Sequence, residues 1–103
     1  MGNAIRVGST PINTFDIPYK AEQVKDIEII YKQSGKEKIL KRKSDIEVSD
    51  FLAKVQLSQE DTFNLDDGTK VQIQLRVKDN RDKVIPSDII VVSVEECLFN
   101  EVF

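Results

Sequence analysis

The chain has 103 residues and a net charge of −3, with 40% hydrophobic and 32% charged residues. This length suits one domain, and the hydrophobic fraction excludes general disorder. The acidic balance opposes non-specific binding of nucleic acid, which depends on Lys and Arg side chains that neutralise phosphates.

The side chains on which most enzymes depend are scarce. The sequence contains no His, the commonest general base and zinc ligand, and a single Cys, Cys97. One Cys excludes an intramolecular disulfide, and its apolar neighbours predict a buried, inert thiol. The four Gly residues are scattered, which argues against a Gly-rich phosphate loop. We therefore expect no catalytic residues, no cofactor and no small-molecule substrate.

No stretch approaches the roughly 18 apolar residues of a membrane span, and the first residues lack the apolar core of a signal peptide. We expect no membrane partner and synthesis in the cytoplasm. Residues 1–9 are small and polar, which favours a flexible N-terminal arm before a single domain at 10–103.

The first segment expected to be ordered, residues 12–18, favours a short edge strand. Phe15 and Ile17 share one face, while Pro11 and Pro18 remove backbone donors at the ends. Phe15 and Ile17 are therefore candidate interface residues on this edge.

A hairpin is expected next. Residues 26–33 fit helical or strand spacing, and their β-branched side chains favour a strand, after at most one helical turn at 21–25. The turn residues Ser34 and Gly35, followed by the segment 37–42, predict a returning strand.

The hairpin carries a cluster of positive charge. Residues 32–43 hold six Lys and Arg side chains and one Glu. No aromatic residue interrupts residues 36–43, which favours a solvated strand face over a site for nucleic-acid bases. The alternative is a patch for an anionic partner, such as nucleic acid or an acidic neighbouring subunit. The candidate residues of this patch are Lys36, Lys38, Lys41, Arg42 and Lys43.

The middle of the chain predicts a strand followed by a helical turn. Residues 44–50 favour either a short strand pairing or a loop. Apolar residues then alternate through 51–57, and Ser58 three residues before Asp61 is a helix N-cap arrangement that predicts one turn at 58–63. The expected core face of the strand holds Phe51, Ala53, Val55 and Leu57.

Two further strands follow a turn at Asp67 and Gly68. Residues 70–78 alternate apolar and polar side chains, the pattern of a half-buried antiparallel strand. Residues 87–95 are almost wholly β-branched and predict a strand largely covered on both faces. Six to seven short strands with at most one or two short helical turns indicate an all-β antiparallel β-sandwich.

The second half of the chain resembles the last third of an immunoglobulin-like domain. The likeness lies in the order of a strand, the Leu-Ser-Gln-Glu-Asp-Thr corner at 57–62, an alternating strand and a final strand. The inter-sheet cysteines and buried tryptophan of that fold are missing. The expected fold class is an immunoglobulin-like antiparallel β-sandwich.

The last residues, 97–103, form an apolar C-terminal tail. An apolar segment at this position is expected to be shielded from water by the domain itself or by a partner. Either Leu98 and Phe99 close the core of the protein itself, or Phe99, Val102 and Phe103 dock against another subunit.

Acidic residues gather in two predicted turns. They are favoured turn formers, so a structural role is expected. The alternative is a calcium site, although neither group has the ligand spacing of an EF-hand. The groups are Asp66 with Asp67, and Asp79 with Asn80 and Asp82.

Several of these segments together resemble a family of small proteins carried by tailed phages and prophages of Gram-positive, largely gut, bacteria. The matching segments are 10–11, 14–18, 24–33, 57–62, 71–77, 87–90 and 94–98. The resemblance implies a phage origin, synthesis in the host cytoplasm, and a minor structural role in the virion as a head, connector or tail decoration module. The implied partners are other virion proteins or further copies of the chain in a symmetric oligomer.

The expected function is therefore a non-enzymatic virion structural protein that makes contacts through residues 1–18 and 97–103. Two alternatives remain. One is an intracellular regulator that inhibits a host protein through acidic loops. The other is a host-surface or carbohydrate-binding module, which needs exposed aromatic residues, and Tyr19 and Tyr31 are the only tyrosines.

Overall fold

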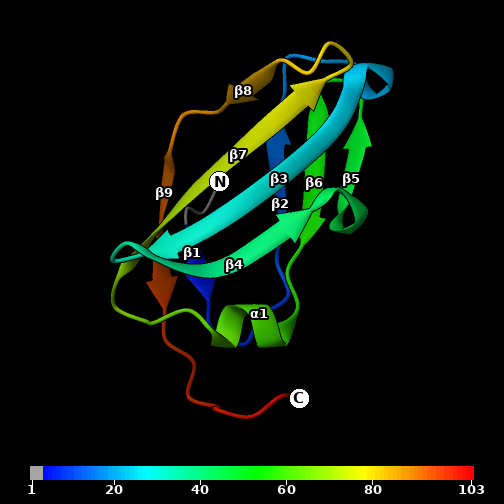
Figure 1. Cartoon of the computed structure of the whole chain (residues 1–103). Helices are drawn as coiled ribbons and strands as arrows, with labels where there is room; N and C mark the ends of the chain where they lie inside the picture. Colours follow the sequence, from blue (N-terminus) through cyan, green and yellow to red (C-terminus); the bar gives the residue numbers. More distant parts are fainter. Residues whose placement is uncertain (1–3) are drawn as a thin grey trace.

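The structure, a computed structural model, describes residues 4–103 as two β-sheets packed face to face (Figure 1). The larger sheet holds, in spatial order, β1 (Ala4–Arg6), β9 (Ile90–Glu95), β7 (Lys70–Asp79), β3 (Val24–Gln33) and β4 (Lys36–Arg42), and β8 (Val84–Pro86) also pairs with β7. The smaller sheet holds β2 (Ile12–Asp16), β6 (Leu52–Gln56) and β5 (Ile46–Ser49). Neighbouring strands are antiparallel except β1 and β9, which are parallel.

The strand order is that of an immunoglobulin-type sandwich. In the smaller sheet, β2, β6 and β5 take the places of strands B, E and D. In the larger sheet, β4, β3, β7 and β9 take the places of strands C′, C, F and G. The predicted all-β sandwich is confirmed. The structure has more strands than the expected six or seven. The difference comes from β1, β5 and β8, which have only three or four residues each and are too short to show a clear alternating pattern.

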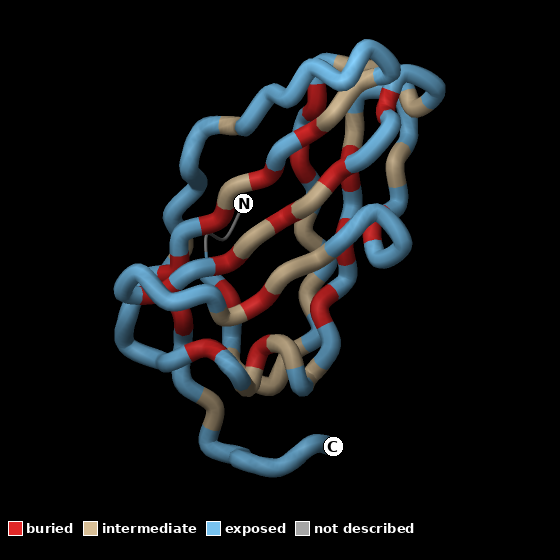
Figure 2. The backbone as a smooth tube through the Cα atoms, viewed as in Figure 1, coloured by how far each residue is buried: buried red, intermediate tan, exposed pale blue. Residues whose placement is uncertain are grey.

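The core follows the period of two along each strand, and buried and exposed residues alternate in Figure 2. In β7 the buried members are Val71, Ile73, Leu75 and Val77, as the alternation predicted. Tyr31 of β3 is fully buried, and its hydroxyl accepts a hydrogen bond of 2.7 Å from Asn13 Nδ2 of β2. This bond joins the two sheets inside the core.

Local sequence signals position the connections. The two-residue turn between β3 and β4 has Ser34 and Gly35 at φ values of 50° and 77°, as a type I′ hairpin turn requires. The helix α1 (Gln59–Phe63) begins at Ser58, whose hydroxyl accepts from Asp61 N while the Asp61 carboxylate accepts from Ser58 N. This capping box confirms the helical turn predicted at 58–63, which leads the chain from the smaller to the larger sheet. Among the described residues, the other helical elements are two 3-10 turns, η1 (Ala21–Gln23) and η2 (Lys43–Asp45).

The interpretation of residues 1–9 as a flexible arm is wrong for the described part of that segment. Ala4–Arg6 forms β1, and Ile5 is only 3% exposed within the core. Residues 1–3 lie outside the described residues. The burial of Ile5 depends on pairing with β9, nearly ninety positions away in the chain, which local composition does not reveal.

Two expectations about burial are also wrong. The segment 87–95 is not covered on both faces, because it lies beside the edge strand β1 and the smaller sheet has only three strands to cover it. The exposed members are Ile89, Ile90 and Val91. Phe51 is also exposed rather than in the core face, because it occupies the β5–β6 turn with a φ of 64°.

Candidate functional site

The strand β1 fixes the point where the last segment leaves the sandwich. Arg6 Nη2 forms an ion pair of 2.6 Å with Glu95, and Arg6 Nη1 donates to the carbonyl of Glu96. Val7 N also donates to Glu95 O. Residues 97–103, here called the tail segment, therefore start from an anchored position at the α1 end of the molecule (Figure 1).

The tail segment exposes its large apolar side chains. Leu98 is 94% exposed, Phe99 79%, Val102 59%, and Phe103 is fully exposed. The expectation that Leu98 and Phe99 close the core is therefore wrong, because neither joins the core cluster. Cys97 is half-exposed, so the prediction that its thiol is buried is wrong. The alternative that Phe99, Val102 and Phe103 dock against another subunit stays a prediction.

The tail segment and α1 enclose an apolar hollow of about 490 Å³. Phe103 N donates to Gln59 Oε1 at 3.0 Å, and Gln59 Nε2 donates to the carbonyl of Gly8. Gly8 has a φ of 82°, and a Cβ there would stand 3.0 Å from the Phe63 ring, so glycine lets this loop approach the helix. The lining residues are Gly8, Gln59, Phe63, Cys97, Phe99, Glu101, Val102 and Phe103.

The other two candidate interface residues do not reach this surface. Phe15 and Ile17 belong to the core, with 6% and 4% exposure, so their assignment as interface residues is wrong. Odd-numbered residues of this segment face the larger sheet, and the exposed apolar side chain of β2 is Ile12. The prediction that Phe15 and Ile17 share one face of the strand is therefore correct, but this face is buried in the core and is not exposed to a partner.

The candidate anionic-partner patch lies along β4 and η2, where neighbouring acids already pair with three of its members. Lys38 pairs with Asp66 at 3.2 Å, Lys41 with Asp61 at 2.7 Å, and Arg42 with Glu28 at 2.8 Å. Lys43 Nζ donates to the carbonyl of Lys25. Within residues 4–103, only Lys36 and Lys43 of the five lack an ion pair with an acidic side chain.

The carboxylate of Asp61 links this strand to the helix cap. Partial burial raises the pKa of Asp61, but hydrogen bonds from Lys41 and Ser58 outweigh burial, so the pKa lies below its usual value. The ionised form is therefore stabilised by both the helix N-terminus and the β4 lysine.

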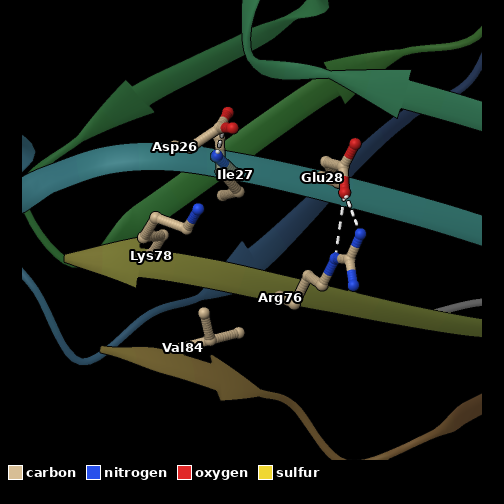
Figure 3. Close-up of a pocket in the computed structure, with 6 residues that line it drawn as sticks. All are labelled: Asp26, Ile27, Glu28, Arg76, Lys78 and Val84. Atoms are coloured by element: carbon tan, nitrogen blue, oxygen red, sulfur yellow. Dashed lines mark hydrogen bonds and ion pairs between the residues drawn. The ribbon is translucent and has the colours of Figure 1, made fainter. Parts of the chain in front are cut away.

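A second surface lies on the outer face of the larger sheet, the face turned away from the smaller sheet. Glu28 of β3 forms ion pairs with two arginines, namely Arg76, which Figure 3 draws, and Arg42. Arg76 donates through Nε and Nη2 to Glu28 Oε1 at 2.9 and 2.6 Å, and Arg42 Nη1 donates to Oε2 at 2.8 Å. The Glu28 side chain is 16% exposed and each arginine side chain 67%, so this cluster presents positive charge to solvent.

Two adjoining hollows flank this arginine cluster. One has a volume of about 330 Å³ and includes Asp26 and Lys78, and the other, of about 360 Å³, includes Ile30 and Leu40. Both hollows are lined by Glu28, Arg76 and Val84. The sequence analysis did not identify this surface. Its only signal is charge at outward positions of three strands, and the sequence does not reveal how these strands pair.

The acidic groups considered for calcium lie at opposite ends of β7. Asp66 pairs with Lys38, Asp82 pairs with Lys25, and Asp79 accepts from the backbone of the turn that follows it. These backbone hydrogen bonds lower the pKa of Asp79. Over the range 4–103, no three His, Cys, Asp or Glu side chains are grouped so that they could hold a metal ion. In the same range, no helix has the length and apolar character to span a membrane.

No protein-family model, curated protein or solved structure matches the chain. Two surfaces of the molecule are candidate binding sites, the apolar hollow beside the tail segment and the arginine cluster with its two hollows. The first offers apolar side chains to a partner. The second offers arginine side chains beside two hollows, of which the one with Ile30 and Leu40 is mainly apolar and the one with Asp26 and Lys78 is mainly polar.

Proposed function

We propose that the protein is a non-enzymatic assembly protein that binds other proteins through its tail segment. The observation that carries this proposal is the exposure of four large apolar side chains within seven residues, each more than half exposed. Exposed apolar clusters mark interaction sites, and aromatic side chains are the commonest anchors in protein interfaces. Burial of each such side chain stabilises a contact by roughly 1.5–3 kcal/mol.

The resemblance to phage proteins supports a role for this activity among the structural proteins of a tailed phage. A small domain with an anchored apolar segment suits a head, connector or tail decoration module, where many copies meet one another or other virion proteins. The ion pairs of Asp61, Asp66 and Asp82 with lysines leave these acids less available for the alternative of an acidic regulator. The core position of Tyr31 likewise weakens the alternative of a carbohydrate-binding module.

The test is incorporation into particles. Mass spectrometry of purified virions is expected to find the intact chain, whereas a variant truncated after Glu96 is expected to fold and to be missing from particles. A control is Phe51→Ser, which removes another exposed aromatic residue, at the β5–β6 turn. Absence of the intact chain from virions, or full incorporation of the folded truncated variant, would contradict the proposal.

A further inference from the structure

We propose that the tail segment of one copy docks on the outer face of the larger sheet of a second copy. In this contact Phe99 and Phe103 enter the two hollows, one ring in each, and Glu101 pairs with Arg76 and Arg42 between them. The inference rests on the proposed function and identifies the partner of the tail segment as the chain itself.

The tail segment has the chemistry of a ligand for a cationic, partly apolar surface. Residues 97–103 contain Glu101 and no Lys or Arg, and Glu95 and Glu96 precede them. In an extended chain, side chains two residues apart share one side. Phe99, Glu101 and Phe103 then form one row, with a carboxylate between two aromatic rings that lie roughly 13 Å apart.

The outer face offers matching positions in the same order. Asp26 borders one hollow and Ile30 the other, and these residues are four positions apart in β3, which is roughly 13 Å along a strand. Glu28 and Arg76 border both hollows, so they occupy the place between the two rings. The tail pattern of aromatic, acid and aromatic therefore meets a pattern of hollow, arginine and hollow.

Charge complementarity supports a second copy as the occupant. Glu28 holds both guanidinium groups in place, and each arginine keeps N–H donors that point to no other side chain within residues 4–103. A carboxylate that reaches a pre-positioned guanidinium forms a strong, charge-assisted hydrogen bond. The outward positions of β3, β4 and β7 carry more cations than acids, namely Lys32, Arg42, Lys70, Arg76 and Lys78 against Asp26, Glu28 and Glu37.

The two surfaces lie on different parts of the molecule, so the contact is head-to-tail. The tail segment leaves at the α1 end (Figure 1), whereas both hollows are lined by residues of β3 and β7, and Figure 3 draws the one that includes Asp26 and Lys78. Head-to-tail contacts between identical copies generate rings or open filaments rather than closed two-fold dimers. A repeating contact of this kind suits a component of a symmetric particle.

Two complementary variants test the contact. Val84→Asp places a negative charge beside both hollows while it leaves the tail segment intact, and truncation after Glu96 removes the tail segment while it leaves the face intact. Sedimentation velocity is expected to show concentration-dependent association of the intact chain and only monomers of either variant alone. A mixture of the two variants is expected to form a dimer with one copy of each and nothing larger. Ile12→Asp, on the smaller sheet, is the matched control and is expected to associate like the intact chain.

A double-mutant cycle in that mixture tests the ion pair. Glu101→Gln in the tail-bearing variant is expected to weaken the dimer about tenfold, equivalent to roughly 1.4 kcal/mol. Arg76→Gln in the face-bearing variant is expected to add little further loss, because the two changes remove one shared interaction. Salt of about 1 M, where the screening length is roughly 3 Å, is expected to weaken the dimer similarly.

The outcomes separate this inference from the proposed function. An intact chain that stays monomeric at high concentration, or a mixture that stays monomeric, overturns docking on this face. If the tail segment is nevertheless required for incorporation into particles, the proposed function stands and its partner is another virion protein. Additive effects of Glu101→Gln and Arg76→Gln would also overturn the assigned pairing.

Discussion

At the scale of single residues, Gln33 ties the end of β3 to the loop that precedes β7. Its side chain is buried, and its amide pairs with both backbone groups of Asp66, accepting from N at 2.8 Å and donating to O at 2.9 Å. Gln33→Met would leave both groups without these partners, so we expect the free energy of unfolding to fall by about 1–3 kcal/mol in urea denaturation. Gln72→Met, at an exposed position of β7, is the control and should change it by less than about 0.5 kcal/mol. Equal effects of the two changes would refute the role of Gln33.

Tyr31 makes stability sensitive to alkaline pH. Burial raises the pKa of its hydroxyl to about 12, partly opposed by the hydrogen bond from Asn13 and assisted by the charge of Asp61. Because the folded-state pKa exceeds the reference value of 10.0, this contribution to stability is complete below pH 10 and is lost as the pH rises toward 12. We expect unfolding measured between these pH values to show this decline, and Tyr31→Phe to reduce its slope. An unchanged slope in Tyr31→Phe would contradict the expectation.

At the scale of elements, the sequence predicted strands correctly where apolar and polar residues alternate over a long segment. The alternation in β7 and the capping residues Ser58 and Asp61 are local signals, and each predicted the observed element. The β-branched residues of β9 indicate that the segment forms a strand. They do not indicate whether its faces are buried, because burial depends on the width of the opposing sheet. The strand β1 has three residues and shows no measurable period, so it was missed.

The candidate site divides in the same way. The apolar composition of 97–103 identified the tail segment, but its exposure depends on the tertiary structure, because the segment leaves the sandwich after β9 and lies beside α1 without joining the core. The arginine cluster depends on register, since Glu28 lies opposite Arg42 on one side and Arg76 on the other. These are tertiary facts, because the three residues are separated by up to 48 positions along the chain.

The missed strand β1 supports a direct prediction. Ile5→Ala should lower the free energy of unfolding by about 2–4 kcal/mol, because Ile5 is enclosed by the core and its removal leaves a cavity. Ile12→Ala makes the same chemical change at an exposed position and should cost less than about 0.5 kcal/mol. Chemical denaturation of both variants gives the comparison. A small effect at Ile5 would restore the interpretation of this segment as a flexible arm.

At the scale of the whole molecule, charges that look clustered in sequence are dispersed by folding. The basic segment 32–43 lies against acids from β3, α1 and the loop before β7, so its charge is partly neutralised within the chain. The Lys38–Asp66 and Arg42–Glu28 pairs each have one largely exposed partner, and pairs of this kind contribute little to stability, typically less than about 1 kcal/mol each. The core cluster therefore carries most of the stability, and the surface pairs shape the electrostatic field that a partner meets.

Stability and assembly should therefore respond to different parts of the chain. Truncation after Glu96 removes residues that belong to no core cluster and whose described link to the rest is the hydrogen bond from Phe103 N to Gln59. We expect the free energy of unfolding to change by no more than about 0.5–1.5 kcal/mol. We expect its dependence on urea concentration to stay the same. Urea denaturation in dilute solution, where copies do not meet, measures this. A loss of several kcal/mol would mean that the tail segment covers the core of its own chain, and its exposed phenylalanines could then no longer be attributed to a partner.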